Sequence, residues 1–173
     1  MRMSPTGRTR ERGFTLVELA VVTLIVVALA AVAAPSFAGF QRASQARNCA
    51  WGVATLARRA RDYAICHGVR VALEYDGEER RFLLAQETDP GQFEPLALAG
   101  ALPVTAPDSV EAIALSVEGQ EAGPESPVVF FPDGQALRAE IMLEGSQGRL
   151  TVTIAPLTGR VRVVEGDAGE PVG

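Results

Sequence analysis

Gly13-Phe14-Thr15-Leu16-Val17-Glu18-Leu19 opens the longest apolar run of the chain, which then continues to Ala34 with Thr23 as its one polar interruption. As a helix, the 21 residues from position 14 to position 34 would extend about 31 Å, which matches the hydrocarbon core of a bilayer. Four arginines precede the run, at positions 2, 8, 10 and 12. Because basic flanking residues stay on the cytoplasmic side, the sequence predicts one spanning helix with the rest of the chain exported.

Three kinds of export signal could account for this N-terminus. A secretory signal peptide would be cut at a small-residue site such as Ala31-Val32-Ala33, but the apolar run is long for one and has a carboxylate near its start. A plain signal anchor explains the length of the run and leaves Glu18 unexplained. An ionised side chain in a membrane helix costs about 2.5–3.5 kcal/mol, so such a group usually has a partner. The third kind of signal, which the residues around Glu18 resemble, supplies such a partner.

Gly13 followed by Phe14, with Glu18 at the fifth position after the cut, resembles the cleavage site of type IV prepilins. The resemblance implies that a membrane peptidase cuts after Gly13 and methylates the new N-terminus at Phe14, and that the apolar helix is retained. It also implies that Glu18 is the assembly carboxylate. In a fibre, Glu18 of one subunit would pair with the Phe14 amine of its neighbour and fix the axial register.

An amphipathic segment follows the apolar run and extends from Ser36 to His67. Pro35 ends or kinks the apolar run. After it, apolar residues recur at three- and four-residue spacing with arginines between them, which is typical of a helix with one buried face. Gly68 is the candidate C-cap of this helix.

The remainder of the chain has the pattern of an antiparallel β domain. Strands are predicted at 69–75 and 81–86 around a polar turn, and then at 110–117, 128–131, 136–143, 149–155 and 160–164. Residues 88–109 are predicted to be a long connection, and the Gly-, Glu- and Pro-rich stretch up to Pro127 a second one. Residues 166–173 are expected to form a loose tail.

The C-terminal sequence resembles a narrower family. Phe130-Phe131-Pro132-Asp133-Gly134, an alternating strand, and then Thr158-Gly159-Arg160-Val161-Arg162-Val163 are similar to the C-terminal domain of GspH/FimT-like minor pseudopilins. The segment from Leu56 to Ala64, before Gly68, also resembles the helix end of that family. The resemblance implies a pilin-like α+β fold, with a long N-terminal helix packed on two small antiparallel sheets.

The charge of the chain opposes general binding of nucleic acid. Its net charge is −5, and removal of residues 1–13 leaves 12 arginines against 20 acidic residues, a net charge of −8. Any such site would have to be local. Arg160 and Arg162 should project from one face of the last strand, together with Arg149 and the threonine hydroxyls of the strand before it. Gly159 to Arg162 resembles the motif with which FimT-type minor pilins are proposed to bind DNA, by weak and salt-sensitive phosphate contacts.

The sequence predicts no catalytic residue, no set of metal ligands and no cofactor. His67 is the one histidine, and its neighbour Cys66 would point in another direction on a helix. Cys49 and Cys66 would lie about 25 Å apart along that helix, beyond disulfide reach, so we expect them to be reduced or packed, with an intermolecular bridge as the alternative. The arginines at positions 58, 59 and 61 are expected to make structural or subunit contacts.

These observations predict a minor pseudopilin of a type II secretion system, and the alternative is a type IV pilus minor pilin that binds DNA during uptake. The expected parts are a leader (1–13), a transmembrane helix half (14–35), a periplasmic helix half (36–67), a β-rich head (68–165) and a tail (166–173). The expected partners are other pseudopilins or minor pilins, the prepilin peptidase and the assembly platform of the inner membrane. The chain would cross the bacterial inner membrane once, with its N-terminus cytoplasmic and its head periplasmic. An exported enzyme or binding module with an ordinary signal peptide is the third possibility.

Overall fold

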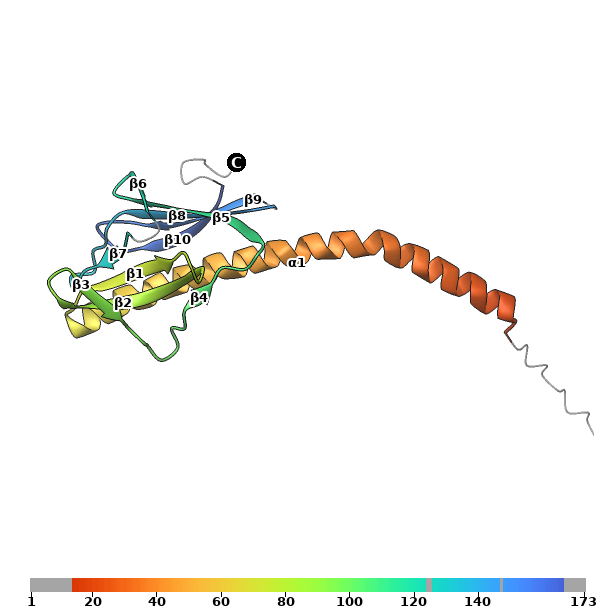
Figure 1. Ribbon diagram of the computed structural model, residues 1–173, viewed down its shortest axis with the longest axis horizontal. Coiled ribbons are helices and arrows are strands. Elements are labelled where there is room, and N and C mark those ends of the chain that lie inside the picture. Colours follow the sequence, from red (N-terminus) through yellow and green to blue (C-terminus); the bar gives the residue numbers. More distant parts are fainter. Residues whose placement is uncertain (1–13, 124–125, 147, 167–173) are drawn as a thin grey trace, which may run out of the picture. The chain divides into compact units, whose positions relative to one another are not determined.

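A computed structural model describes residues 14–123, 126–146 and 148–166 of the chain (Figure 1). The chain divides into two compact units, one ending at Ala38 and the other beginning at Gly39. One helix, α1 (Leu16–His67), passes through both. The helix is continuous through Pro35, so this proline does not end it.

The first unit contains the N-terminal part of α1. Thr15 caps it, because the Thr15 Oγ1 atom accepts a hydrogen bond from the backbone N–H of Glu18 at 3.2 Å, in the Thr-x-x-Glu pattern of a capping box. The apolar side chains from Leu16 to Leu29 are exposed. Among the residues that the structure describes, no helix is both long enough and apolar enough to cross a bilayer. The membrane-spanning role of residues 14–34 therefore stays a prediction.

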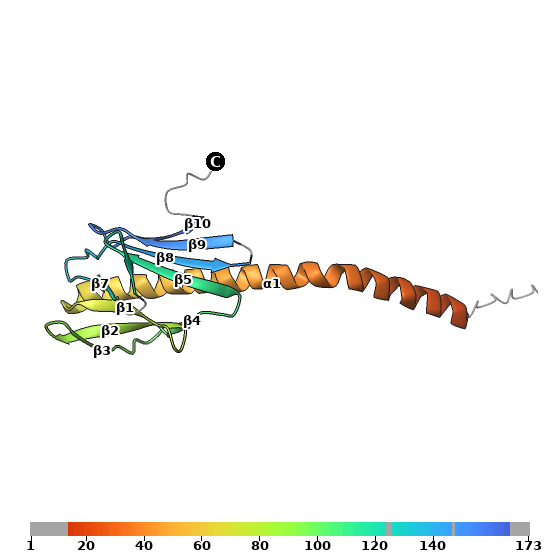
Figure 2. The same cartoon turned by 45° about the horizontal axis from the view of Figure 1, so that its top comes forward.

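The second unit combines the rest of α1 with two antiparallel sheets of five strands each (Figure 2). The first sheet has the order β3-β2-β1-β7, with β4 paired to β2, and the second has the order β10-β9-β8-β5-β6. The strands of the first sheet are β1 (Val71–Asp76), β2 (Arg81–Asp89), β3 (Gln92–Pro95), β4 (Val104–Thr105) and β7 (Val128–Phe130). Those of the second are β5 (Val110–Val117), β6 (Gln120–Ala122), β8 (Ala139–Gly145), β9 (Gly148–Ile154) and β10 (Val161–Glu165).

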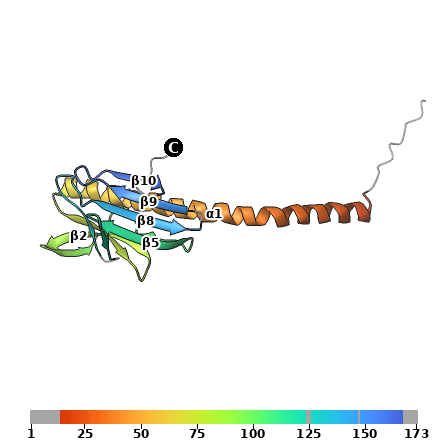
Figure 3. The same cartoon turned by 90° about the horizontal axis from the view of Figure 1, so that it is seen from above.

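One hydrophobic core joins the helix to both sheets. The helix contributes mainly small side chains, and six of them are fully buried: Ala50, Val53, Ala54, Ala57, Ala60 and Ala64. Larger side chains, such as Phe82 and Phe130 in the first sheet and Ile141 in the second, fill the space opposite. Full burial of each large apolar side chain stabilises the fold by about 1.5–3 kcal/mol. The alanine face lets the sheets approach α1 closely, and Figure 3 shows β10, β9, β8 and β5 side by side along it.

The structure confirms the predicted end of the helix. Gly68 adopts φ +67°, and its N–H donates to the Ala64 carbonyl oxygen at 3.0 Å. A left-handed glycine in this position is the common way to end a helix. The predicted hairpin that follows is also confirmed, since β1 and β2 pair in register from Val71 opposite Gln86 to Asp76 opposite Arg81.

The two predicted connections are wrong, because they contain the short strands β3, β4 and β6. The β5–β6 hairpin turns at Glu118 and Gly119, whose φ angles are 54° and 78°. Two positive φ values suit the tight turn of a two-residue hairpin, but glutamate is not a residue that normally signals one. These strands depend on pairing with longer neighbours, since none has an apolar pattern long enough to predict it alone.

Candidate functional site

The predicted processing site lies at the start of the described chain. Gly13 falls outside the described residues. Phe14 is 80% exposed, and the Glu18 side chain is exposed as well. Pairing between Glu18 and the Phe14 amine of a neighbouring subunit stays a prediction, because it concerns two chains.

Both turns of the C-terminal motifs contact the same side chain of α1, that of Arg61. The Arg61 Nε–H donates to the carbonyl oxygen of Gly134 in the Pro-Asp-Gly turn, at 3.3 Å. Gly159 of the Thr-Gly-Arg turn lies against the same side chain: a Cβ atom there would be 2.7 Å from Arg61 Cδ and 2.7 Å from the Gly134 oxygen. Gly159 also has φ +56°, so both its conformation and its surroundings require glycine. The motifs that resemble the GspH/FimT family thus place both turns against the helix.

Two further arginines of α1 contact the edge strand β10. The Arg58 Nη2 group donates to the Val161 carbonyl oxygen at 3.4 Å, and Arg47 forms an ion pair with Glu165 at 2.7 Å. An exposed edge strand can pair with other chains, and side chains that cover it prevent this. The predicted structural role of Arg58 and Arg61 is therefore confirmed, whereas Arg59 is exposed on another side of the helix.

The structure corrects the predicted arginine face on the last hairpin. Arg160 and Arg162 are exposed and line one hollow, but their third companion there is Arg138, not Arg149. Arg149 lies near the other end of β9, where its guanidinium pairs with Glu144 at 3.4 Å. Register explains the separation, because Arg162 pairs with Thr153, four residues along the strand from Arg149.

The predicted row of threonine hydroxyls on this face is also incomplete. Thr151 is fully buried, and its Oγ1–H donates to the Gly166 carbonyl oxygen at 2.7 Å. The Gly166 N–H in turn donates to the Arg149 carbonyl oxygen at 2.9 Å. The residue that follows β10 therefore covers Thr151, and only Thr153 remains partly exposed.

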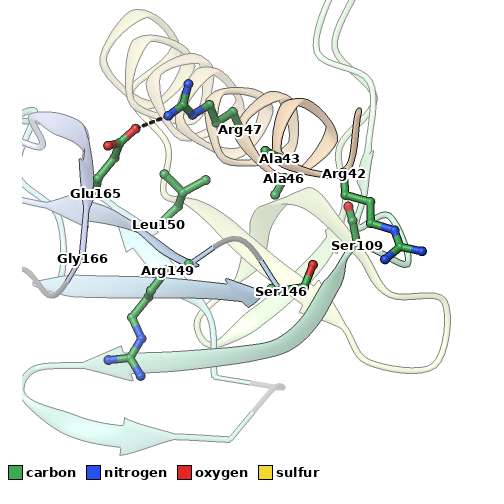
Figure 4. Close-up of a pocket in the computed structure, with 12 residues that line it drawn as sticks. Arg42, Ala43, Ala46, Arg47, Ser109, Ser146, Arg149, Leu150, Glu165 and Gly166 are labelled. Atoms are coloured by element: carbon green, nitrogen blue, oxygen red, sulfur yellow. Dashed lines mark hydrogen bonds and ion pairs between the residues drawn. The ribbon is translucent and has the colours of Figure 1, made fainter. Parts of the chain in front are cut away.

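Arg149 borders a separate cavity of about 280 Å³ between α1 and the strand ends of the second sheet (Figure 4). Arg42 and Arg47 border it from the helix. Figure 4 shows the ion pair between Arg47 and Glu165 on the helix side of the cavity, with the Arg149 side chain directed away from that pair. The three arginines therefore do not converge on a common point.

The two cysteines have different environments and are not bonded to each other. Cys49 is buried in the core, and Cys66 is exposed near the end of α1. Burial raises the pKa of the Cys49 thiol to about 11, with a smaller opposing effect from Arg80. Burial also raises the pKa of Glu74, whose carboxylate lies half-buried on β1. No group of three potential metal-ligating side chains occurs among the described residues.

Comparison with known proteins shows what this chain is similar to. Residues 8–34 match the family described as the prokaryotic N-terminal methylation motif. A search of curated proteins finds no match.

The fold is similar to that of solved minor pseudopilin structures. The minor pseudopilin EpsH from the type 2 secretion system of Vibrio cholerae matches with a TM-score of 0.58 and 15% identity, over 74% of this chain and 99% of that one. A crystal structure of EpsH from the same organism matches with a TM-score of 0.59 and 14% identity, over 73% and 98% of the two chains. The solution structure of Escherichia coli GspH matches with a TM-score of 0.52 and 15% identity, over 74% and 93%.

Proposed function

We propose that this chain is a minor pseudopilin of a type II secretion system. The observation that carries the proposal is the combination of a methylation motif at residues 8–34 with a GspH-type fold that extends over 74% of the chain.

In this function, residues 1–13 are the leader that the prepilin peptidase removes, and Phe14 becomes the methylated N-terminus. Residues 14–35 anchor the subunit in the inner membrane, residues 36–67 continue as the periplasmic half of the helix, and residues 68–165 form the periplasmic head. Glu18 is the carboxylate that recruits the subunit to a filament, through the amine of a neighbouring subunit. The partners are other pseudopilins and the assembly platform, and the role is mechanical.

A role in DNA uptake receives less support from the geometry. The predicted phosphate-binding face included Arg149 with Arg160 and Arg162, and the structure places Arg149 at the other end of the strand. The carboxylate of Glu140 also lines the hollow at Arg160 and Arg162, where it would repel phosphate.

Deletion of the gene, followed by measurement of the proteins released into the medium, tests the proposal. We expect secretion to fall, wild-type protein to restore it, and Glu18→Val to fail. Glu111→Val is the matched control and should restore secretion, because the Glu111 carboxylate is exposed on the head and lies far from the motif in sequence. Unchanged secretion in the deletion strain, together with loss of DNA uptake, would contradict the proposal in favour of the pilus alternative.

A further inference from the structure

A hollow of about 470 Å³ lies on the outer face of the second sheet, at the end where β9 turns into β10. Thr153 of β9 and Ala155, the residue that follows β9, line it with small side chains. The Ala155 N–H donates to the Arg160 carbonyl oxygen at 3.0 Å, so Arg160 lies beside Ala155 on one flank. On the other flank, the pairing of Ala139 with Ile154 places Arg138 beside Ala155.

Arg138 and Arg160 therefore face each other across one alanine. Adjacent strands lie about 4.8 Å apart, so the two Cα atoms are separated by about 10 Å. Two extended guanidinium groups at this separation can close on one small anion, and Ala155 leaves the space between them open. Arg162 lies on the same side of the hollow as Arg160, two residues further along the chain.

These three arginines differ from those that hold the helix to the last hairpin. Arg47, Arg58 and Arg61 each have a partner on the head. Arg138, Arg160 and Arg162 are exposed, and none of them forms an ion pair with another of the described residues. Guanidinium groups without an ion pair, gathered around one hollow, can donate hydrogen bonds to a ligand from outside the chain.

We propose that Arg138 and Arg160 clamp a carboxylate of a partner subunit, an aspartate or glutamate side chain that enters the hollow above Ala155. The proposal rests on the proposed function, because a filament supplies such partners. A carboxylate accepts two parallel hydrogen bonds from a guanidinium group, which gives the contact orientation as well as strength.

The lining of the hollow favours a single carboxylate over a nucleic-acid backbone. Glu140 pairs with Thr153, and Thr153 pairs with Arg162, so this next row of the sheet contains a carboxylate opposite Arg162. One anion between Arg138 and Arg160 avoids Glu140. Successive phosphates of a nucleic acid would have to pass it, and Glu140 would repel them.

Nuclear magnetic resonance of the full chain in detergent micelles at low salt tests this clamp. The probe is an acetylated tetraglutamate peptide, and the acetylated tetraglutamine peptide is its neutral counterpart. We expect saturable shifts of the Nε–Hε signals of Arg138 and Arg160 with tetraglutamate only. Arg138→Gln and Arg160→Gln should each weaken binding about threefold to tenfold, the range for a charge-assisted contact that is partly exposed to water.

Two further variants separate the proposed contact from general charge attraction. Arg59→Gln removes an equal charge outside the hollow and should leave binding unchanged. Glu140→Gln removes the competing carboxylate and should strengthen it. Equal weakening by Arg59→Gln, or no shift at Arg138 and Arg160, would overturn the proposal. Tighter binding of duplex DNA that is lost in the same two arginine variants would also overturn it, in favour of a phosphate ligand. None of these results affects the secretion test. The clamp can therefore be disproved while the proposed function still stands.

Discussion

The Arg61 Nε–H donates to the carbonyl oxygen of Gly134 at 3.3 Å, and the Arg61 side chain also packs against Gly159. One helical residue thus holds two turns that are far apart in sequence. The glycines of the Pro-Asp-Gly and Thr-Gly-Arg motifs are explained by this contact, without any ligand. Arg160, next to Gly159, has no part in this contact, and its exposed side chain can interact with a partner subunit.

Replacement of Arg61 by alanine should destabilise the head. The variant loses a hydrogen bond to a backbone carbonyl and the packing of the side-chain stem, so we expect the free energy of unfolding to fall by about 1–2 kcal/mol. Thermal unfolding followed by circular dichroism measures the change. Arg59→Ala is the control, since Arg59 is exposed on the same helix, and it should change stability by less than about 0.5 kcal/mol. Equal effects of the two variants would contradict the role of Arg61.

Gly159→Ala should be more damaging than Gly68→Ala. Both glycines have positive φ angles, 56° and 67°, so alanine costs about 1–2 kcal/mol in backbone conformation at either position. No atom lies within 4 Å of the Cβ position at Gly68, whereas at Gly159 two atoms lie at 2.7 Å. The overlap should add at least about 1 kcal/mol to the cost at Gly159. Equal losses of stability in denaturant titrations would show that the turn can move away from Arg61.

Thr151→Val should lower stability, and Thr153→Val should not. The buried Thr151 hydroxyl donates to the Gly166 carbonyl oxygen, and valine would leave that oxygen without its donor, at a cost of about 1 kcal/mol. Thr153 lies on the same strand and is partly exposed, so the pair controls for the higher strand propensity of valine. Comparison of the two midpoints of urea unfolding measures the difference, and a smaller loss for Thr151→Val than for Thr153→Val would contradict the burial of this hydroxyl.

The two thiols should react very differently. Burial raises the pKa of Cys49 to about 11, so at pH 8 its thiol is protonated as well as shielded. Iodoacetamide should therefore modify Cys66 alone in the folded chain and both cysteines after unfolding, as peptide mass mapping would show. Because the raised pKa means that the folded state holds the proton more tightly, the stability linked to Cys49 is complete below the unfolded pKa near 9 and is lost as pH rises towards 11. Cys49→Ala should remove this loss, and rapid labelling of Cys49 at pH 8 would contradict its burial.

The sequence predicted best those structural features that depend only on neighbouring residues along the chain. Gly68 could be recognised as a helix cap, and the alternation of Val128–Phe130 and Ile141–Leu143 as buried strands, because periodicity and turn chemistry are local properties. The partner of a strand and its register are not local. For that reason, alternation placed Arg149 on the correct face but could not show that it lies away from Arg160.

Arg138 is the site residue that the sequence analysis missed. A usable signal was present, since the inward-facing Ala139 and Ile141 place Arg138 and Glu140 together on the outer face. Its proximity to Arg160 depends on the pairing of β8 with β9, which links positions about 15 residues apart. The contacts of Arg61 with two separate turns could not be predicted from the sequence either, because they also join residues that are far apart along the chain.

Mass spectrometry of the mature chain tests the central claim most directly. If the chain is a pseudopilin, its purified form should begin at Phe14, with one methyl group on the N-terminal amine and the apolar helix still present. Gly13→Leu should block this cleavage and leave the leader attached, which shows that the start at Phe14 requires the motif. A mature chain that begins near Ala34, without methylation, would identify an ordinary signal peptide and contradict the account.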